Sequence, residues 1–285
     1  MPSSSVATAL DTSAQRVKIR PPRRWQGLDL PSILEYRELI YFLAKRELQV
    51  RYKQSIVGIG WVVMQPLVIA FVFALFFGLV AGIPSEGFPF PVFAIVGLVP
   101  WLFTSQAVSQ SAGSLVMDAN LISKVYFPRL ALPIAKALGL MVDFAISLVV
   151  VLVVLAAYGV GVSSMAFLVP LFLLLAVLTA FGAGTLFSAI NVRYRDVSVI
   201  VPVLLQIWIF ASPVIYPGSL VSGPLQYVWA LNPMVSVLDG TRWALLGASA
   251  PDPLMVAIST ASALSVLFIA IVYFRRTEQF FADVI

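Results

Sequence analysis

Ionisable residues that could do chemistry are few in this sequence, and their spacing matches no catalytic centre. The chain contains no His and no Cys, which removes the commonest general base and the thiolate ligands of metal sites. The phosphate-binding pattern G-x-x-x-x-G-K-S/T and the nucleophile pattern G-x-S-x-G are both absent. We therefore predict that this chain is not an enzyme by itself, holds no cofactor or metal, and takes its energy from elsewhere if it moves a solute uphill.

Two ionisable features fall inside apolar stretches, where a charge is costly and therefore informative. Asp143 lies seven residues after Lys136 in an otherwise apolar run, and Asp239 precedes Arg242 by three residues. A proton- or sodium-coupled carrier would need a buried acid such as Asp143. We favour the alternative that a basic neighbour holds this acid near the inner end of a span. Residues three apart share a helix face, so Asp239 and Arg242 could form an ion pair.

The composition identifies the elements that must position these residues. Hydrophobic residues make up 60% of the chain and charged residues 11%, whereas soluble domains carry about a quarter charged residues. A membrane helix needs about 20 apolar residues, and the sequence offers six such runs. The predicted fold is an all-α integral membrane protein with spans at 56–83, 90–117, 137–162, 165–192, 197–217 and 254–274.

Basic residues alternate with these spans in a way that indicates a topology. All but one of the 18 Lys and Arg residues fall before the first span, in the second and fourth links, or in the tail. Lys and Arg collect on the cytoplasmic side, so we predict an even number of spans with both termini in the cytoplasm. A basic stripe could instead bind nucleic acid, but its alternation with apolar spans argues against that partner.

The stretch before the first span divides in two. Residues 1–31 are predicted to form a basic cytoplasmic tail, and residues 32–53 an amphipathic helix that leads into the six-span domain 54–285. Ser32 and Glu35 fit a capping box at the start of that helix. A basic amphipathic helix next to a span is typical of the membrane surface. Packing on a partner is the alternative.

The inner link at 116–136 is more than a simple loop. Asp118 and Asn120 are possible helix caps, followed by a short helix at 121–127 that Pro128 ends. Such a helix, projecting between two spans, is a natural docking element for a cytosolic partner. An ordinary inter-span loop is the alternative interpretation.

The outer segment at 218–253 is too long for a tight turn and too apolar to be freely solvated. It contains two apolar pieces, 224–231 and 233–247, separated by Asn232 and Pro233. Irregular backbone at membrane depth must be packed in protein or line a cavity. We therefore expect two short re-entrant helices that form an outer lid, with Asp239 and Arg242 in the second of them.

Aromatic residues are plentiful and cluster toward the predicted outer half. Their flat faces could line a path along which sugar rings slide without being trapped by charges. Lipid-facing or packing roles are the alternative for each of them. The candidates for lining a path are Phe90, Phe93, Trp101, Phe103, Trp208, Phe210, Tyr216, Tyr227 and Trp229.

Several stretches, in order, resemble the membrane subunits of ABC-2-type exporters of O-antigen, capsule and teichoic acid. The resemblance covers about residues 33–285, and several matched blocks are more specific than one short motif. The blocks are "YRELIYFLAKRELQVRYKQSIVGIGWVVMQPL" (36–67), "NLISKVYFPRLALP" (120–133), "NVRYRDVSVIVPVLLQIWIFASPVIYP" (191–217), "LNPMVSVLDGTRWALLG" (231–247) and "EQFFADVI" (278–285).

The resemblance implies a homodimer in the bacterial inner membrane with a path at its interface. Two copies of a separate ATPase, which binds ATP and Mg²⁺, would lie beneath it. The substrate would be a polysaccharide or polyol-phosphate polymer on undecaprenyl diphosphate. The helix at 32–50 would be an interface helix, 118–127 a coupling helix, and 218–253 would supply outer gate helices. The coupling candidates are Glu38, Arg46, Asp118, Asn120, Lys124, Val125, Tyr126, Phe127 and Arg129.

The charge of the carrier lipid suggests a further set of residues. A diphosphate is anionic, so Arg46, Arg51 and Lys53 near the inner gate are candidates to receive it. The alternatives are an ABC-2 permease that exports a drug or small lipid, an ion-coupled carrier that fails when Asp143 becomes Asn, and a membrane scaffold with no wide path.

Overall fold

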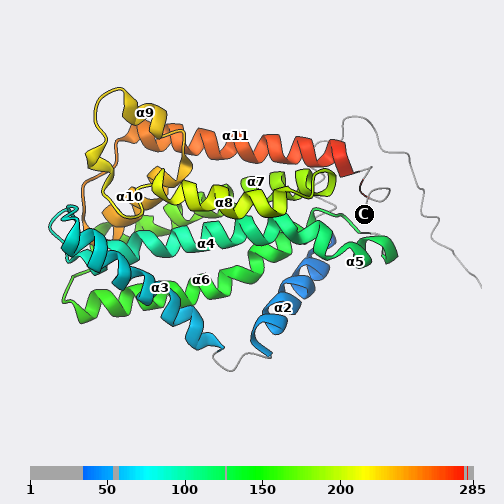
Figure 1. Cartoon of the computed structure of the whole chain (residues 1–285), viewed down its shortest axis with the longest axis horizontal. Helices are drawn as coiled ribbons and strands as arrows, with labels where there is room; N and C mark the ends of the chain where they lie inside the picture. The colour runs from blue at the N-terminus through cyan, green and yellow to red at the C-terminus, as the bar shows by residue number, and fades with distance from the viewer. Residues whose placement is uncertain (1–34, 54–57, 126, 279–280, 282–285) are drawn as a thin grey trace, which may run out of the picture.

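The computed structural model describes residues 35–53, 58–125, 127–278 and 281, and every regular element within them is a helix (Figure 1). The tail 1–31, Ser32 of the predicted capping box, and Tyr126 lie outside the described residues. The helices are α2 (Arg37–Lys53), α3 (Ile59–Phe73), η1 (Ala74–Val80), α4 (Phe90–Met117), α5 (Ala119–Lys124), α6 (Ala131–Ala157), η2 (Ser164–Leu168), α7 (Val169–Arg193), α8 (Val197–Phe210), η3 (Gly218–Leu220), α9 (Leu225–Trp229), α10 (Pro233–Leu246) and α11 (Pro253–Thr277).

Five helical stretches of the described chain are long and apolar enough to cross a membrane. They are Ile59–Val80, Phe90–Met117, Ala131–Ala157, Ser164–Arg193 and Pro253–Thr277. The expected span at 197–217 is different, because its helix α8 has only 14 residues and ends at Phe210. At 1.5 Å per residue α8 is about 21 Å long, short of the hydrocarbon thickness of about 30 Å. Five of the six predicted spans are therefore continuous helices, and the sixth is a short helix followed by turns.

Helix α4 runs through the middle of the bundle (Figure 1) and packs against α3, α6, α7 and α10. Small residues let α4 and α7 approach closely. A Cβ on Gly184 of α7 would lie 2.7 Å from the Cβ of Ser111 on α4, so only glycine fits there. Ser114 and Ser188 bond across the same contact, with 3.2 Å between their hydroxyl oxygens. This pair of helices forms the frame on which both ends of the bundle are built.

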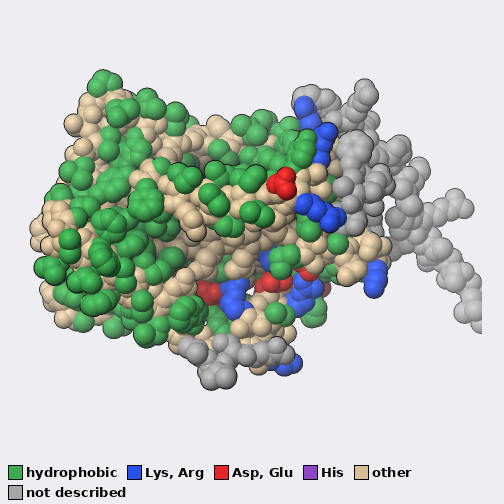
Figure 2. Space-filling view, viewed as in Figure 1, with side chains coloured by type: hydrophobic (Ala, Val, Ile, Leu, Met, Phe, Trp, Pro, Cys, Tyr) green, Lys and Arg blue, Asp and Glu red, His purple; other side chains and the backbone are tan. Residues whose placement is uncertain are grey.

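Charged residues gather at one end of the bundle. Helices α2 and α5 and the end of α11 lie there, whereas α9 and α10 lie at the opposite end (Figure 1). Figure 2 shows Lys and Arg side chains at the α2, α5 and α11 end, beside a long apolar surface. We call this the inner end and the other the outer end, following the predicted topology.

Candidate functional site

Helix α2 is attached to the bundle by its apolar face. Ile40, Leu43 and Ala44 are buried, and the helix packs against α6. Gly139 of α6 allows this approach, since a Cβ there would lie 3.2 Å from the Cβ of Glu47. Tyr41 and Phe42 point away, with 68% and 66% of their surface exposed. The protein itself therefore covers one face of this helix, and the aromatic face stays open.

A network of four charges joins α2 to α6 and to the start of α5. The Arg46 Nη2 atom lies 2.6 Å from Asp118 Oδ1, and Lys136 Nζ lies 2.8 Å from Glu47 Oε1 and 3.5 Å from Asp118 Oδ2. The hydrogen bond to Asp118 raises the pKa of Arg46 above its ordinary value. Asp118 does stand at the N-cap position of α5, but its carboxylate makes no capping bond. Arg46 and Asp118, two coupling candidates, are thus held by each other.

The inner link folds into a shorter helix than predicted. Helix α5 ends at Lys124, and Val125 is already extended. Glu38 on α2 and Asn120, Lys124 and Val125 on the link are exposed and can meet a partner. Phe127 is 5% exposed and packs in the core at the inner end, and its part in the coupling contact stays a prediction. This buried aromatic, directly before Pro128, anchors the link to the bundle.

Two residues after α11, Glu278 and Phe281, contact this link, which the sequence did not reveal. Arg129 donates from its backbone nitrogen to Glu278 Oε1 at 3.2 Å and from its guanidinium to the Glu278 carbonyl. The guanidinium also lies over the ring of Phe281, which is buried and packs edge-on against Phe274 at 5.3 Å. Arg129, a coupling candidate, therefore connects the inner link to the segment after α11. The family-like sequence block at 278–285 was the signal that could have pointed to this contact.

Removing the Phe281 ring is expected to loosen the inner link without unfolding the bundle. In Phe281→Ala the Arg129 amide loses support, and its hydrogen should exchange about tenfold faster, equivalent to about 1.4 kcal/mol. Hydrogen exchange of peptides covering 127–135, read by mass spectrometry, measures this. Phe268→Ala is the matched control, because Phe268 is 67% exposed on α11. If the wild type, Phe281→Ala and Phe268→Ala all exchange at the same rate, the segment after α11 does not hold the inner link.

Asp143 is paired, and its partner comes from α2. The Asp143 carboxylate accepts from the Arg51 guanidinium and from the Tyr52 hydroxyl, and Arg51 Nη2 also donates to Gln110 Oε1 at 3.0 Å. Burial, with the bond to Asp143, raises the pKa of Tyr52 to about 12, so its hydroxyl keeps its proton and donates. A basic neighbour therefore holds Asp143, but it is Arg51 and not the nearby Lys136. Of the other two lipid-phosphate candidates, Lys53 is exposed and Arg46 is bonded to Asp118.

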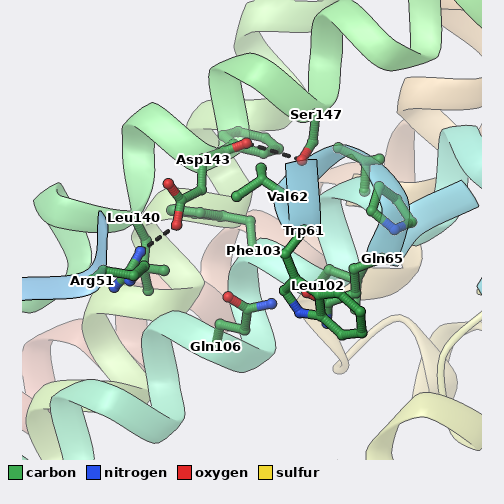
Figure 3. A pocket seen from close by; sticks show the side chains of 13 residues that line it. Arg51, Trp61, Val62, Gln65, Leu102, Phe103, Gln106, Leu140, Asp143 and Ser147 are labelled. Atoms are coloured by element: carbon green, nitrogen blue, oxygen red, sulfur yellow. Dashed lines mark hydrogen bonds and ion pairs between the residues drawn. The ribbon is translucent and has the colours of Figure 1, made fainter. Parts of the chain in front are cut away.

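A cavity of about 200 Å³ opens beside this pair, between α3, α4 and α6 (Figure 3). Its mouth and walls mix apolar and polar side chains, and Figure 3 shows Arg51, Gln106 and Trp61 around it. The lining residues are Arg51, Trp61, Val62, Gln65, Pro66, Val99, Leu102, Phe103, Gln106, Leu140, Asp143, Phe144 and Ser147.

At the outer end, Asn232 ties the irregular backbone after α8 to the two short helices. Its Oδ1 accepts from Trp208 Nε1 at 2.9 Å and caps α10 through the Met234 amide at 3.1 Å. Its Nδ2 donates to the Ala211 carbonyl at 3.1 Å and to Ser212 Oγ at 2.9 Å. The prediction of two short helices separated at Asn232–Pro233 is confirmed. Their entry into the outer leaflet stays a prediction.

Arg242 holds the same irregular backbone after α8 from the buried side. Its guanidinium donates to the carbonyls of Pro213 at 2.5 Å and Val214 at 2.6 Å, and lies 3.7 Å from the centre of the Phe93 ring. The predicted pair with Asp239 is present, with 3.7 Å between Nη1 and Oδ1. Arg242 is 1% exposed. It therefore satisfies backbone carbonyls in the irregular segment after α8, and its role in an outer gate stays a prediction.

The nine aromatic candidates separate into two groups. Phe93 and Trp101 are buried and line no path in this conformation, and Phe103 is buried except where it borders the cavity between α3, α4 and α6. Trp101 packs edge-on against Trp208 at 5.5 Å, and Phe103 stacks on Phe144 at 4.5 Å. The remaining candidates keep some exposed surface, namely Phe90, Trp208, Phe210, Tyr216, Tyr227 and Trp229. Of these, Tyr216 and Trp229 stack on each other at the outer end.

Comparison with known proteins identifies the class to which this helical architecture belongs. The ABC-2 type transporter family matches residues 38–246, and the chain belongs to that family. The O-antigen export system permease protein RfbA of Myxococcus xanthus is 32% identical over 87% of this chain and 96% of its own length. A permease of the same name from Klebsiella pneumoniae is 24% identical over 87% and 95%. The polysialic acid transport protein KpsM of Escherichia coli is 25% identical over 82% and 91%.

Proposed function

We propose that this chain is the permease subunit of an ATP-driven exporter that moves a lipid-linked polysaccharide across the bacterial inner membrane. The observation that carries the proposal is the identity of 32% to an O-antigen export permease over nearly the whole of both chains. Polysialic acid transport in a more distant relative extends the same substrate class. The carrier we propose is undecaprenyl diphosphate, and both termini lie in the cytoplasm.

The energy for transport comes from a separate ATPase subunit that binds ATP and Mg²⁺. This chain has no phosphate-binding motif, and its inner end offers an exposed surface on α5. A groove beside α5 is lined by Ile122, Ser123, Lys124, Val125, Phe127 and Arg129. Of these residues Lys124 and Val125 are exposed, which suits them to contact the ATPase. Closure of the ATPase would push α5, and the charge network would carry that movement to α2 and α6.

Two copies of the chain form the transporter in this proposal. Within one copy, Phe93, Trp101 and Phe103 are packed in the core, so surface aromatics must line a path. Phe210 is 63% exposed, and Tyr216 and Trp229 lie close by in the outer segment. A path between two copies would be lined from both sides by such residues. Ion coupling is not favoured, because Arg51 already neutralises Asp143.

Co-expression with the ATPase encoded nearest to this gene tests the proposal. The wild-type chain is expected to co-purify with it and to stimulate ATP hydrolysis. Lys124→Glu with Val125→Asp should weaken the complex at least tenfold, because the few hot-spot residues of an interface contribute about 2 kcal/mol or more each. Arg195→Glu, an exposed charge reversal in the α7–α8 link, is the matched control. Failure of the ATPase to co-purify under gentle extraction would contradict the assignment.

A further inference from the structure

The cavity between α3, α4 and α6 has the two-part character of a lipid site. Its apolar walls include Val62, Phe103 and Phe144, and its polar side carries Arg51 and Gln106 (Figure 3). Arg51 lies in the last turn of α2 and Trp61 near the start of α3, so the cavity lies where the chain enters the membrane. Trp61 is 61% exposed, so this part of the cavity lining reaches the surface of the chain.

The free hydrogen-bonding groups of this cavity are mainly donors. Both carboxylate oxygens of Asp143 are already bonded, one to Tyr52 and one to Arg51. Arg51 has five N–H groups, of which one bonds Asp143 and one bonds Gln110. The other three have no partner among the described residues, nor do the Gln106 amide and the Trp61 indole N–H. A ligand that supplies acceptor oxygens would satisfy them.

The charges around the cavity also favour a ligand that carries acceptor oxygens. Arg51 and Asp143 neutralise each other, and Lys53, two residues further on, is exposed and adds a positive charge. The lining therefore carries no net charge of its own, and apart from Arg51, Asp143 and Gln106 its residues are apolar except for Gln65 and Ser147. Phosphate esters carry oxygens that accept several hydrogen bonds, and guanidinium groups bind them well.

We propose that this cavity binds the phosphate and the first chain carbons of a prenyl or acyl lipid from the inner leaflet. Arg51, Gln106 and Trp61 hold the phosphate oxygens, and Val62, Phe103 and Phe144 contact the chain. The inference rests on the proposed function only in naming the prenyl carrier as one source of this lipid. An ordinary membrane phospholipid is the other source, with the same chemistry.

Native mass spectrometry of the full-length chain in detergent tests the proposal with three probes. These are farnesyl phosphate, farnesol and short-chain phosphatidylglycerol. Farnesyl phosphate or phosphatidylglycerol should bind at one site per chain, and farnesol at least tenfold more weakly. Gln106→Leu, and Arg51→Gln combined with Asp143→Asn, should each weaken phosphate-lipid binding about tenfold, since each removes donors to a charged group. Arg195→Gln, an exposed arginine elsewhere at the inner end, should bind like the wild type.

The pattern of results separates the possible sources and failures. Preference for farnesyl phosphate identifies the carrier lipid, and preference for phosphatidylglycerol identifies a resident lipid, and both support the site. Equal binding of farnesol, or phosphate-lipid binding that neither variant weakens, overturns it. If the ATPase co-purifies but no phosphate lipid binds, the cavity proposal fails and the exporter proposal stands. If lipid binds but no ATPase associates, the reverse holds.

Discussion

Replacing Arg242 by leucine is expected to destabilise the folded protein by about 4 kcal/mol or more, leaving little of it folded. In the folded chain the guanidinium donates hydrogen bonds to the carbonyls of Phe93, Pro213, Val214 and Tyr216. Pro213 and Val214 are buried, so water cannot replace the lost donors. The change would also leave Asp239 without its cation. Thermal unfolding in detergent, monitored by size-exclusion chromatography, measures the loss of stability.

Two further variants show whether the geometry of the guanidinium or merely its charge matters. Arg242→Lys keeps the charge but replaces a planar fork by a point donor, so about half of the loss should remain. Gly97→Ala changes no charge, yet its new Cβ would collide with Arg242 Nη2 and displace the fork. Arg195→Leu removes an exposed arginine and should leave the midpoint within about 1 °C, since surface changes stay near ±0.5 kcal/mol or less. If Arg242→Leu and Gly97→Ala both unfold at the wild-type temperature, the end of α8 does not depend on this side chain.

Replacing Asp143 by alanine is expected to release the end of α2 and to uncouple ATP hydrolysis from transport. Arg51 would lose its ionised partner and Tyr52 its acceptor, a loss of about 2 kcal/mol at this partly exposed pair. The amides of residues 48–53 should then exchange faster, by about thirtyfold at most. The same purified complex reports the ATPase rate with and without substrate, and stimulation by substrate should weaken while the basal rate of hydrolysis remains.

Asparagine and a charge exchange distinguish a structural Asp143 from an ion-binding one. Asp143→Asn keeps an acceptor for Tyr52 and should retain a large part of the activity. Arg51→Asp with Asp143→Arg should recover some of what either single change loses, because the pair is rebuilt in reverse. Ion coupling predicts the opposite pattern, with transport abolished in Asp143→Asn although α2 exchanges as in the wild type.

Much of the class and some of the local structure could be predicted from the sequence. Apolar runs and the placement of Lys and Arg are properties of neighbouring residues, so spans and the inner end could be predicted without coordinates. The break at Asn232–Pro233 and the Asp239–Arg242 pair are also local, since one depends on proline and the other on residues three apart. The five blocks that resemble polysaccharide exporters led to the family that residues 38–246 confirm.

Only the tertiary structure decided which residues meet and which are covered. Asp143 lies 92 positions from Arg51 in the chain, and spacing alone offered Lys136 as its partner. Phe127, Phe93, Trp101 and Phe103 have the same residue types as surface aromatics, but neighbouring helices bury them. Helix α8 could stop at Phe210 because Asn232 and Arg242 supply donors to the following carbonyls. Sequence patterns report local periodicity and composition, whereas burial and long-range pairing depend on packing between helices far apart in the chain.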